Sequence, residues 1–561
     1  MSAEALRVVL CWHMHQPEYR DPLTGAWQSP WTYLRTMKDY TDMAAHLEDA
    51  PEGVRAVVNF PPVLLEQITD YGARIRGFLD DNSDPGDPLL AALGAETMPS
   101  EPDRRLALLR RCLQAHETHM VARFAPYARL ADLTRQALES DTGPGYLTDA
   151  HLADLLTWYH LAWLGETVRR RDPRIRDLMG REEGYSVADR RHLVGIIGEL
   201  MDAVIGRYRA LAEAGRLELS TSPYTHPILP LLLDFNSARQ ARPGITLPEA
   251  SAYPGGESRA EWHLARSREA FHEHFGIEPA GCWPSEGAVC TDTLKHIGAA
   301  GFVWAASGEG VLRHSLDDDD PDSTALHRPY RVTEDGPACF FRDDDLADRI
   351  GFVYNDWHGD DAVADFIERL DELADEPGDG RVVAVILDGE NPWEHYPDNG
   401  IHFVPALYRA LVEHSRLHLT TFGECMTDSG VVTAALEGLV AGSWVYGDLN
   451  TWIGDPDKNR AWDLLCDAKA ACDRKLPQID DPGRRAAIER QLAVCEGSDW
   501  FWWFGDYNPG DAVTEFDTLF RGHLRALYRE LEEPPPASLE IPISRGGGHP
   551  ELGGTMRRGG G

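Results

Sequence analysis

Two acidic residues follow apolar runs of the kind that form buried strands, and both are candidates for chemistry. In RVVAVILDGENPWEH (381–395) six apolar residues precede Asp388, and in AGCWPSEG (280–287) an apolar run leads to Glu286. A continuous β-branched run is typical of a strand buried on both faces of a parallel sheet. Because parallel α/β folds form active sites at the carboxyl ends of their strands, Asp388 is a candidate catalytic acid. An aspartate that caps the next helix is the alternative interpretation.

Polar side chains also follow the other apolar runs. They are His13, His15 and Gln16 after 6–11, His226 after 216–221, Glu286 after 280–283, and Asp343 and Asp348 after 338–342. If the strands are parallel, these residues, which are distant in the chain, become neighbours at one rim of the sheet. The sequence therefore predicts one polar site built from several strand ends.

The residue types at this rim are those of sugar chemistry. In a pair of carboxylates, one group protonates the leaving oxygen and the other attacks or stabilises the oxocarbenium-like centre. Aromatic rings stack on the apolar faces of sugars. The tryptophans near these segments are Trp12, Trp27, Trp283, Trp393, Trp444 and Trp452, and ordinary core packing is the alternative for each. The sequence has no serine nucleophile elbow, no phosphate-binding glycine loop and no dinucleotide fingerprint.

The elements that must position these residues alternate between strands and helices. Predicted strands lie at 6–11, 53–60, 216–221, 280–283, 301–307, 338–342 and 381–388, and most are separated by segments with helical spacing. This alternation predicts a parallel sheet with right-handed crossovers. Seven units indicate a closed or nearly closed barrel, and the wide gap after the second strand predicts a helical insertion at about 62–215. An open doubly wound sheet is the structural alternative.

Five segments, in order along most of the chain, resemble the motifs of glycoside hydrolase family 57. They are HMHQP (13–17), GRLELSTSPYTHPILP (215–230), GCWPSEGAV (281–289), VILDGENPWEHYPDNG (385–400) and SWVYGDLNTWIGDPDKNRAWDLL (443–465). The resemblance implies an α/β fold, an incomplete (β/α)7 barrel followed by helices. It also implies action on α-glucans with retention of configuration, with Glu286 as nucleophile and Asp388 as general acid/base. Two carboxylates suffice for this chemistry, so we expect no metal and no cofactor.

Further residues are predicted to bind the substrate. His13, His15, Gln16 and His226 match motif positions near the cleaved sugar, where satisfied core imidazoles are the alternative for the histidines. Glu218 is predicted to bind a sugar hydroxyl or to orient a histidine. Arg342 and Asp348 resemble a family segment near the site, with a surface salt bridge as the alternative. Trp283, Trp393 and Trp452 are the candidate aromatic contacts, and Trp452 is expected to reach over the barrel from a helical domain.

The chain divides into three predicted parts. Residues 1–402 should form the barrel with its insertion, and 403–531 a helical domain that contributes the fifth motif to the site. Residues 532–561 are rich in proline and glycine and are expected to be disordered. The cluster DWFWWFGD (499–506) is interpreted as aromatic core of the helical domain, with a wall of the acceptor sites as the alternative.

The leading function is a retaining α-glucan hydrolase of the α-amylase type. A 4-α-glucanotransferase or a branching enzyme would use the same carboxylates but pass the glycosyl group to a sugar hydroxyl. A metal-dependent carbohydrate deacetylase or mannosidase is an alternative because His-x-His at a strand end can bind zinc. HMHQP, however, supplies no carboxylate ligand beside the pair. A non-catalytic glucan-binding protein is the last alternative, and the presence of both Glu286 and Asp388 argues against it.

Composition limits the partners and the location. The formal net charge of −38 makes nucleic acid an unlikely partner, because binding phosphates requires a basic surface. An acidic surface poor in lysine fits a salt-rich interior, although codon usage could also favour arginine over lysine. Nine scattered cysteines without a C-x-x-C pattern indicate reduced thiols. With no signal peptide and no long apolar run, the sequence predicts a cytoplasmic protein without membrane contact.

Overall fold

A ring of parallel strands forms the centre of the molecule. The computed structural model describes residues 5–316 and 323–548, so the acidic run 317–322 and the last part of the glycine-rich tail lie outside the described residues. The seven strands of the ring are β1 (Leu6–His13), β2 (Ala56–Asn59), β3 (Leu217–Ser220), β4 (Gly281–Cys282), β5 (Trp304–Gly308), β7 (Ala338–Arg342) and β8 (Val382–Asp388). Each of the seven predicted runs overlaps one of these strands, and the α/β prediction is confirmed.

The ring closes in the order β1, β2, β3, β4, β5, β7, β8 and back to β1. Hydrogen-bonded parallel pairing joins every neighbouring pair except β3 and β4. A single bridge between Thr221 and Cys282 links those two strands. The structure is therefore an incomplete (β/α)7 barrel. Two short strands extend it at the side: β6 (Tyr330–Arg331) pairs antiparallel with β7, and β10 (Ala434–Ala435) pairs with β6.

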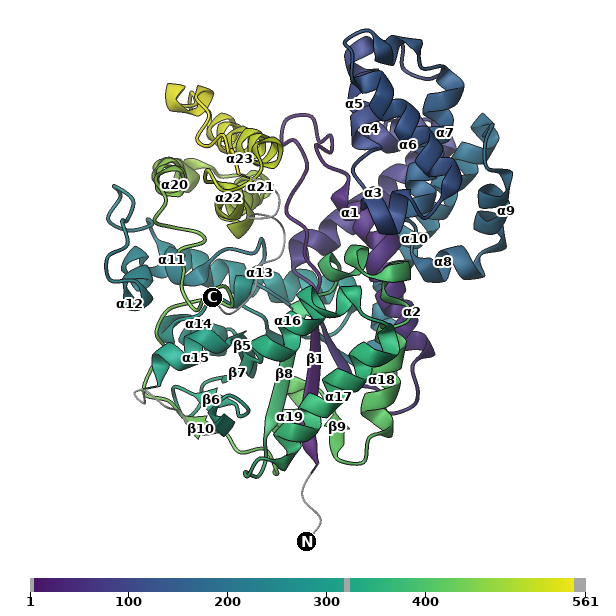
Figure 1. Ribbon diagram of the computed structural model, residues 1–561. Helices are drawn as coiled ribbons and strands as arrows, with labels where there is room; N and C mark the ends of the chain where they lie inside the picture. Colours follow the sequence, from purple (N-terminus) through teal and green to yellow (C-terminus); the bar gives the residue numbers. More distant parts are fainter. Residues whose placement is uncertain (1–4, 317–322, 549–561) are drawn as a thin grey trace.

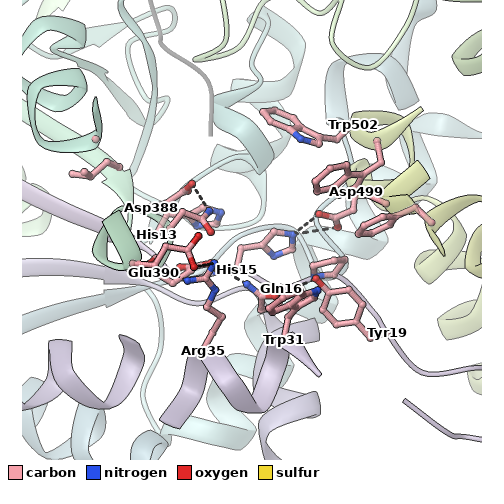
Figure 2. Close-up of a pocket in the computed structure, with 18 of the residues that line it drawn as sticks. His13, His15, Gln16, Tyr19, Trp31, Arg35, Asp388, Glu390, Asp499 and Trp502 are labelled. Carbon is pink, nitrogen blue, oxygen red and sulfur yellow. Dashed lines mark hydrogen bonds and ion pairs between the residues drawn. The ribbon is translucent and has the colours of Figure 1, made fainter. Parts of the chain in front are cut away.

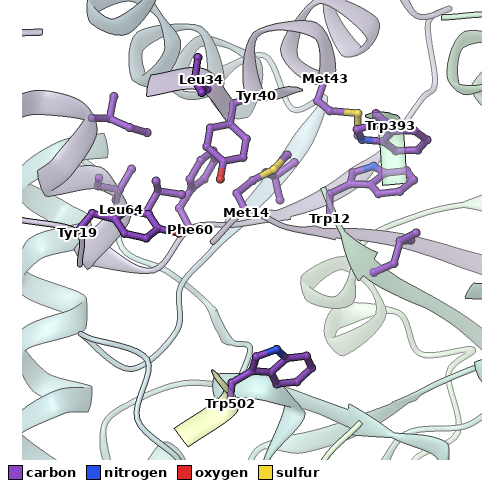
Figure 3. Close-up of a cluster of buried hydrophobic side chains, with 14 of the residues drawn as sticks. Trp12, Met14, Tyr19, Leu34, Tyr40, Met43, Phe60, Leu64, Trp393 and Trp502 are labelled. Carbon is purple, nitrogen blue, oxygen red and sulfur yellow. The ribbon is translucent and has the colours of Figure 1, made fainter. Parts of the chain in front are cut away.

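Strand β1 shows why continuous apolar runs are needed here. All eight of its residues are buried, because alternate side chains face two different apolar regions. Val8, Leu10 and Trp12 pack in the large cluster between strands and helices. Figure 3 shows Trp12 of this cluster beside Trp393. Val9 and Cys11 belong to a second cluster that fills the barrel, together with side chains of β2, β5, β7 and β8.

The helices after the strands cover the outside of the barrel. They are α1 (Trp31–Arg35) and α2 (Thr41–Asp49), joined by the π-helix η1 (Thr36–Tyr40), then α13 (Gly256–Phe275), α14 (Thr291–Ala299), α15 (Glu309–Ser315), α16 (Asp344–Phe352) and α17 (Gly359–Asp375). Strand β9 (Leu417–Leu419) follows α18 (Val404–Glu413) and pairs with the first residues of β1. The sheet thus extends past the predicted barrel boundary at residue 402. β2 pairs only with the last residues of β1, and β9 pairs with its first residues.

A helical insertion separates β2 from β3. Its long helices are α3 (Pro62–Asp81) and α10 (Val187–Glu213), and the shorter ones are α4 (Pro88–Gly94), α5 (Pro102–Arg111), α6 (Ala125–Leu138), α7 (Asp149–Trp163), α8 (Glu166–Arg171) and α9 (Pro173–Arg181). Several begin with proline at the first helical position, and Ser186 with Asp189 forms a capping box at the start of α10. These helices occupy the span in which an insertion is predicted.

A second group of helices lies near the C-terminus: α20 (Pro456–Lys475), α21 (Pro482–Cys495), α22 (Ser498–Trp503) and α23 (Gly510–Glu530). In Figure 1 this group and the insertion lie at the end of the barrel opposite the N-terminus. The prediction of a disordered tail from residue 532 is wrong for 532–548. Leu539 and Ile543 are buried, and the Ile543 amide donates to Asp517 of α23, so this segment packs on the helical domain. Among the described residues we find no helix that is long and apolar enough to cross a membrane.

Candidate active site

A cavity of about 520 Å³ lies at the carboxyl ends of the strands. Both catalytic candidates, Glu286 and Asp388, line it, together with His13, His15 and Gln16 of the first motif. Figure 2 shows Asp388 with the three residues of that motif. Its volume lies within the range of sites that enclose a small ligand. The barrel, the insertion and the C-terminal helices all contribute to its walls.

Strand register brings the first polar residues together. His13, at the end of β1, lies beside Asp388 of β8 on one side and beside Asn59 of β2 on the other. The His13 ring is held by a 2.8 Å hydrogen bond between Nδ1 and Asn59 Oδ1. Because paired residues of parallel strands face the same side of the sheet, three distant segments of the chain meet at one level of the barrel.

Asp388 ends β8 and faces this cavity. Asn391, three residues later, donates a 2.8 Å hydrogen bond from Nδ2 to Asp388 Oδ2. Burial raises the pKa of Asp388 to about 6, although the Asn391 hydrogen bond and the nearby charge of His15 oppose the rise. The group therefore gains or loses its proton close to neutral pH, as an acid/base catalyst must.

Glu286 is held in a strained backbone conformation. Its φ of 59° lies in the left-handed region, in the short 3-10 turn η5 (Ser285–Gly287) that follows β4. Trp444 fixes it twice: its backbone N donates to the Glu286 carbonyl at 3.1 Å, and its Nε1 donates to Oε2 at 3.0 Å. A glutamate costs free energy in this conformation, and such residues cluster at functional sites. The turn directs the carboxylate into the cavity.

The two carboxyl groups titrate as a pair. Burial, followed by the charge of Asp499, raises the pKa of Glu286 to about 8, while Asp388 titrates at about 6. Interacting carboxyls lose their protons in steps that belong to the pair, so between these pH values the pair holds one proton. Without substrate this order of pKa values places the shared proton on Glu286, so the roles of Glu286 as nucleophile and Asp388 as acid require the proton to lie on Asp388 once a sugar is bound.

Three histidine rings stack beside the carboxylates. The ring centroids of His15 and His226 are 3.9 Å apart, and those of His13 and His226 are 5.2 Å apart. Burial lowers the pKa of His13 to about 3 and that of His226 well below its ordinary value. Burial alone would also lower the pKa of His15, but the charge of Asp499, 2.9 Å from Nε2, raises it above the ordinary value. Within the stack the pKa is therefore lowered for His13 and His226 and raised for His15.

The same three rings are the one group with metal-binding spacing that we find among residues 5–316 and 323–548. Their ligand atoms lie within 4.8 Å of one another, and the group contains no carboxylate. Zinc needs each nitrogen about 2.0–2.1 Å from a common point. The planes of adjacent rings differ by 16–26°, so the rings would have to fan apart to reach such a point.

The other predicted substrate residues fall into three sets. Gln16 and Arg342 line the cavity, and Asp348 holds Arg342 by an ion pair of 2.6 Å. His226, Trp283, Trp393 and Trp452 are buried behind the lining, with 0–1% of their surface exposed. Glu218 does not line the cavity. Its carboxylate accepts from Trp304 Nε1 at 2.6 Å and from the Gly423 amide at 2.7 Å, at the start of α19 (Phe422–Thr427), which packs into the barrel interior beside β9.

Sequence reasoning missed several residues of the site. Asp499 contacts His15, and Ser498 Oγ lies 2.9 Å from His226 Nδ1. Glu390 accepts from the His15 amide at 3.2 Å, and its own backbone carbonyl accepts from Arg35. Glu390 carried a signal, since it lies in the same motif as Asp388. Asp499 lies in the aromatic cluster 499–506, and no feature of that cluster distinguishes a carboxylate that reaches the barrel from one that faces solvent.

Aromatic side chains of several helices also line the cavity, and in Figure 2 Trp31 and Trp502 lie away from Asp388. Trp31 and Trp163 lie on the side of α1 and α7, and Trp502, Trp503 and Phe516 on the side of α22 and α23. Trp503 stacks on Phe516 with a centroid distance of 5.1 Å. The cluster 499–506 is thus both core and wall, because Trp500 and Phe501 are buried whereas Trp502 and Trp503 reach the cavity.

Comparison with known proteins identifies relatives over most of the chain. The sequence profile described as "Glycosyl hydrolase family 57" matches residues 9–434. A 1,4-α-glucan branching enzyme of Thermococcus kodakarensis is 25% identical over 281 residues, which are 45% of this chain and 37% of that relative. The fold is similar to that of a branching enzyme of Pyrococcus horikoshii (TM-score 0.58, 15% identity, 96% and 97% of the two chains). It is also similar to that of the α-amylase AmyC of Thermotoga maritima (TM-score 0.55, 12% identity, 94% of each chain).

Proposed function

Because the chain belongs to glycosyl hydrolase family 57 and is therefore an α-glucan-active enzyme, we propose that it is a retaining transglycosylase of the branching type. The observation that carries this choice is the set of aromatic rings from α1, α7, α22 and α23 that lines the cavity, here called the outer wall. Such rings offer stacking surfaces to a second saccharide, whereas a hydrolase needs only a path for water. The likeness to branching enzymes of Thermococcus kodakarensis and Pyrococcus horikoshii supports the same choice.

In the proposed reaction, Glu286 and Asp388 act in turn on one sugar. The Glu286 carboxylate attacks the anomeric carbon as Asp388 gives its proton to the glycosidic oxygen, so that the bond to the leaving chain breaks. A glycosyl ester on Glu286 results. Asp388, now ionised, then takes the proton of an acceptor hydroxyl, whose oxygen attacks the same carbon and releases Glu286. Two inversions retain the α-configuration, and retention requires carboxyl groups roughly 5–5.5 Å apart.

Hydrogen-bond donors around the pair suit these roles. Trp444 Nε1 binds one oxygen of Glu286, which favours the ionised form and leaves the other oxygen for attack. His15, whose pKa is raised, and Arg342 line the same cavity as the carboxylates, where positive charge would stabilise the negative charge of the pair. Arg342 is itself anchored, because it donates to Asp344, Asp348 and the carbonyl of Ile386.

The experiment is incubation with amylose and with maltoheptaose, followed by chromatography, a reducing-end assay and proton NMR. We expect new α-1,6 anomeric signals from amylose with little increase in reducing ends. Longer linear products without α-1,6 signals would indicate a 4-α-glucanotransferase, and a steady increase in reducing ends would indicate the α-amylase type. No change in either substrate would contradict the whole proposal.

A matched pair of tryptophan variants tests the role of the outer wall. Trp503→Ala removes a ring that lines the cavity, and we expect the ratio of hydrolysis to transfer to rise severalfold because the acceptor loses its stacking surface. Trp357→Ala, at an exposed tryptophan (40%) that does not line the cavity, should leave the ratio unchanged. Equal ratios in the two variants would contradict acceptor binding at this wall.

A further inference from the structure

Among the contacts between the helical domain and the barrel is a short turn between α21 and α22. Thr225, in the loop after β3, donates from Oγ1 to the Ala493 carbonyl, and the Ser498 amide donates to the His226 carbonyl at 2.9 Å. At Gly497 the backbones approach closely, since a Cβ there would lie 3.0 Å from the Thr225 carbonyl oxygen. Buried Glu496 anchors the turn by an ion pair with Arg259 at 2.8 Å and a hydrogen bond with His263 Nε2 at 2.7 Å.

Two side chains of this anchored turn reach the histidine stack. Ser498 Oγ lies 2.9 Å from His226 Nδ1, and the Asp499 carboxylate lies 2.9 and 3.2 Å from His15 Nε2. The third ring, His13, is held by Asn59 of the barrel itself. Two of the three rings therefore depend on the helical domain for their orientation.

We propose that Asp499 is a positioning residue that acts through His15. Its carboxylate fixes the ring by Nε2 and compensates its charge, so that a cation is held between Asp499 and the two catalytic carboxylates. Ser498 supports the arrangement by holding the neighbouring ring. The assignment rests on the proposed function only for its effect on turnover, because the orientation and charge of His15 can be measured without substrate.

The environment of His15 explains why one residue of the helical domain can matter so much. The charged groups that face the ring are Asp499 from α22, Glu286 from η5, Asp388 from β8 and Glu390 just after β8, and the stacked His13 and His226 are neutral. Only Asp499 both contacts the ring and lies outside the reacting pair. A carboxylate that orients a histidine in this way is a common support of active-site imidazoles.

The test combines titration with a double-mutant cycle. In NMR spectra of the full chain, with His15 assigned from the His15→Gln variant, the ring should titrate above about 6.5. Asp499→Asn, which keeps the shape but removes the charge, should lower that pKa by at least about one unit. Asp506→Asn, an exposed aspartate of the same domain, makes the same change in net charge and should leave it unaltered.

Kinetic measurements then distinguish an effect of Asp499 through His15 from an effect on the packing of the helical domain against the barrel. Asp499→Asn should lower kcat by about 10- to 100-fold, the range observed when partners of functional histidines are changed. In a His15→Gln background it should cost less than about threefold, because it acts through that ring. An equal loss in both backgrounds, or a His15 that titrates below about 6.5 in the wild type, would overturn the proposal. If the wild type is inactive on these glucans but Asp499→Asn still lowers the pKa of His15, the proposed function is refuted and the positioning role is kept.

Discussion

Two glutamates in the barrel, Glu218 and Glu286, differ in how completely their surroundings satisfy the carboxylate. Both follow or lie within strands, both accept a hydrogen bond from a tryptophan indole, and burial raises the pKa of both. Glu218 has a partner for each oxygen, Trp304 and the Gly423 amide, and it lies in a strand with ordinary geometry. Glu286 has a strained φ of 59° and faces a cavity.

The difference shows how a structural carboxylate can be distinguished from a functional one. At residue 423 a Cβ would lie 3.0–3.1 Å from the Glu218 carboxylate, so a glycine allows the start of α19 to approach and satisfy it. At Glu286 the strained backbone and the burial of the carboxyl group both lower the stability of the fold. Satisfied groups stabilise the fold, and incompletely satisfied ones are available to a substrate.

The largest expected effect is on activity, and it should fall on only one of the two glutamates. Glu286→Gln removes the attacking oxygen and should lower kcat by about 10⁴-fold or more. Glu218→Gln should retain activity within about threefold. Its amide nitrogen would meet a donor, either Trp304 Nε1 or the Gly423 amide, so it should lower the unfolding free energy by about 1–3 kcal/mol. Rate assays and thermal unfolding of both variants measure this, and the reverse pattern would exchange the two roles.

Asp388→Asn tests the second carboxyl group of the active site, the partner of Glu286. Losing the proton donor should cost about 10²- to 10⁴-fold on glucans. An activated α-glycosyl fluoride needs little protonation and should still react, and the sugar should then accumulate on Glu286 because deglycosylation lacks its base. Mass spectrometry after quenching locates the label. A label on another residue, or a β-anomer as the first product, would show that the pair is wrongly assigned.

The pH dependence of stability tests the raised pKa of Glu286. A carboxyl whose pKa is raised by folding binds its proton more tightly in the native state, so the unfolding free energy falls as the pH rises. For Glu286 the fall should extend from its ordinary value of 4.5 to about 8. Glu286→Gln should therefore be more stable than the wild type at pH 8, by roughly 2–4 kcal/mol, and equally stable near pH 4. Thermal unfolding at both pH values tests this, and a variant that is less stable at pH 8 would contradict the raised pKa.

The smallest expected effect is that of salt, which should be the same for variants of Glu218 and of Glu286. With a net charge of −38, the thermal midpoint should rise when the Debye length shrinks from ~30 Å at 0.01 M to ~3 Å at 1 M salt. Screening acts mainly on exposed charges, so the wild type, Glu218→Gln and Glu286→Gln should show the same increase. A midpoint that does not rise would argue against an important repulsion at the surface.

Much of the barrel could be predicted from local patterns. Each of the seven strands overlaps an apolar run, because a strand covered on both faces favours apolar side chains along most of its length. The rule that polar groups at the carboxyl ends of parallel strands converge brought Glu286, Asp388, His13 and His15 to one cavity. Alternation along β3 also predicts that Glu218 faces inward. It does not tell which end of the barrel the side chain reaches, because that depends on register and on what α19 covers.

The sequence by itself thus determined the strands, the catalytic pair as candidates and the side of the sheet that carries the site, since these follow from periodicity and from the ends of apolar runs. Only the tertiary structure decided which partners complete that site. Asp499 and His15 are 484 residues apart, and their contact depends on a turn anchored by the ion pair between Glu496 and Arg259. Trp283, Trp393 and Trp452 lie within motifs but are buried behind the cavity. No local pattern records such placements, because they arise from the packing of one domain on another.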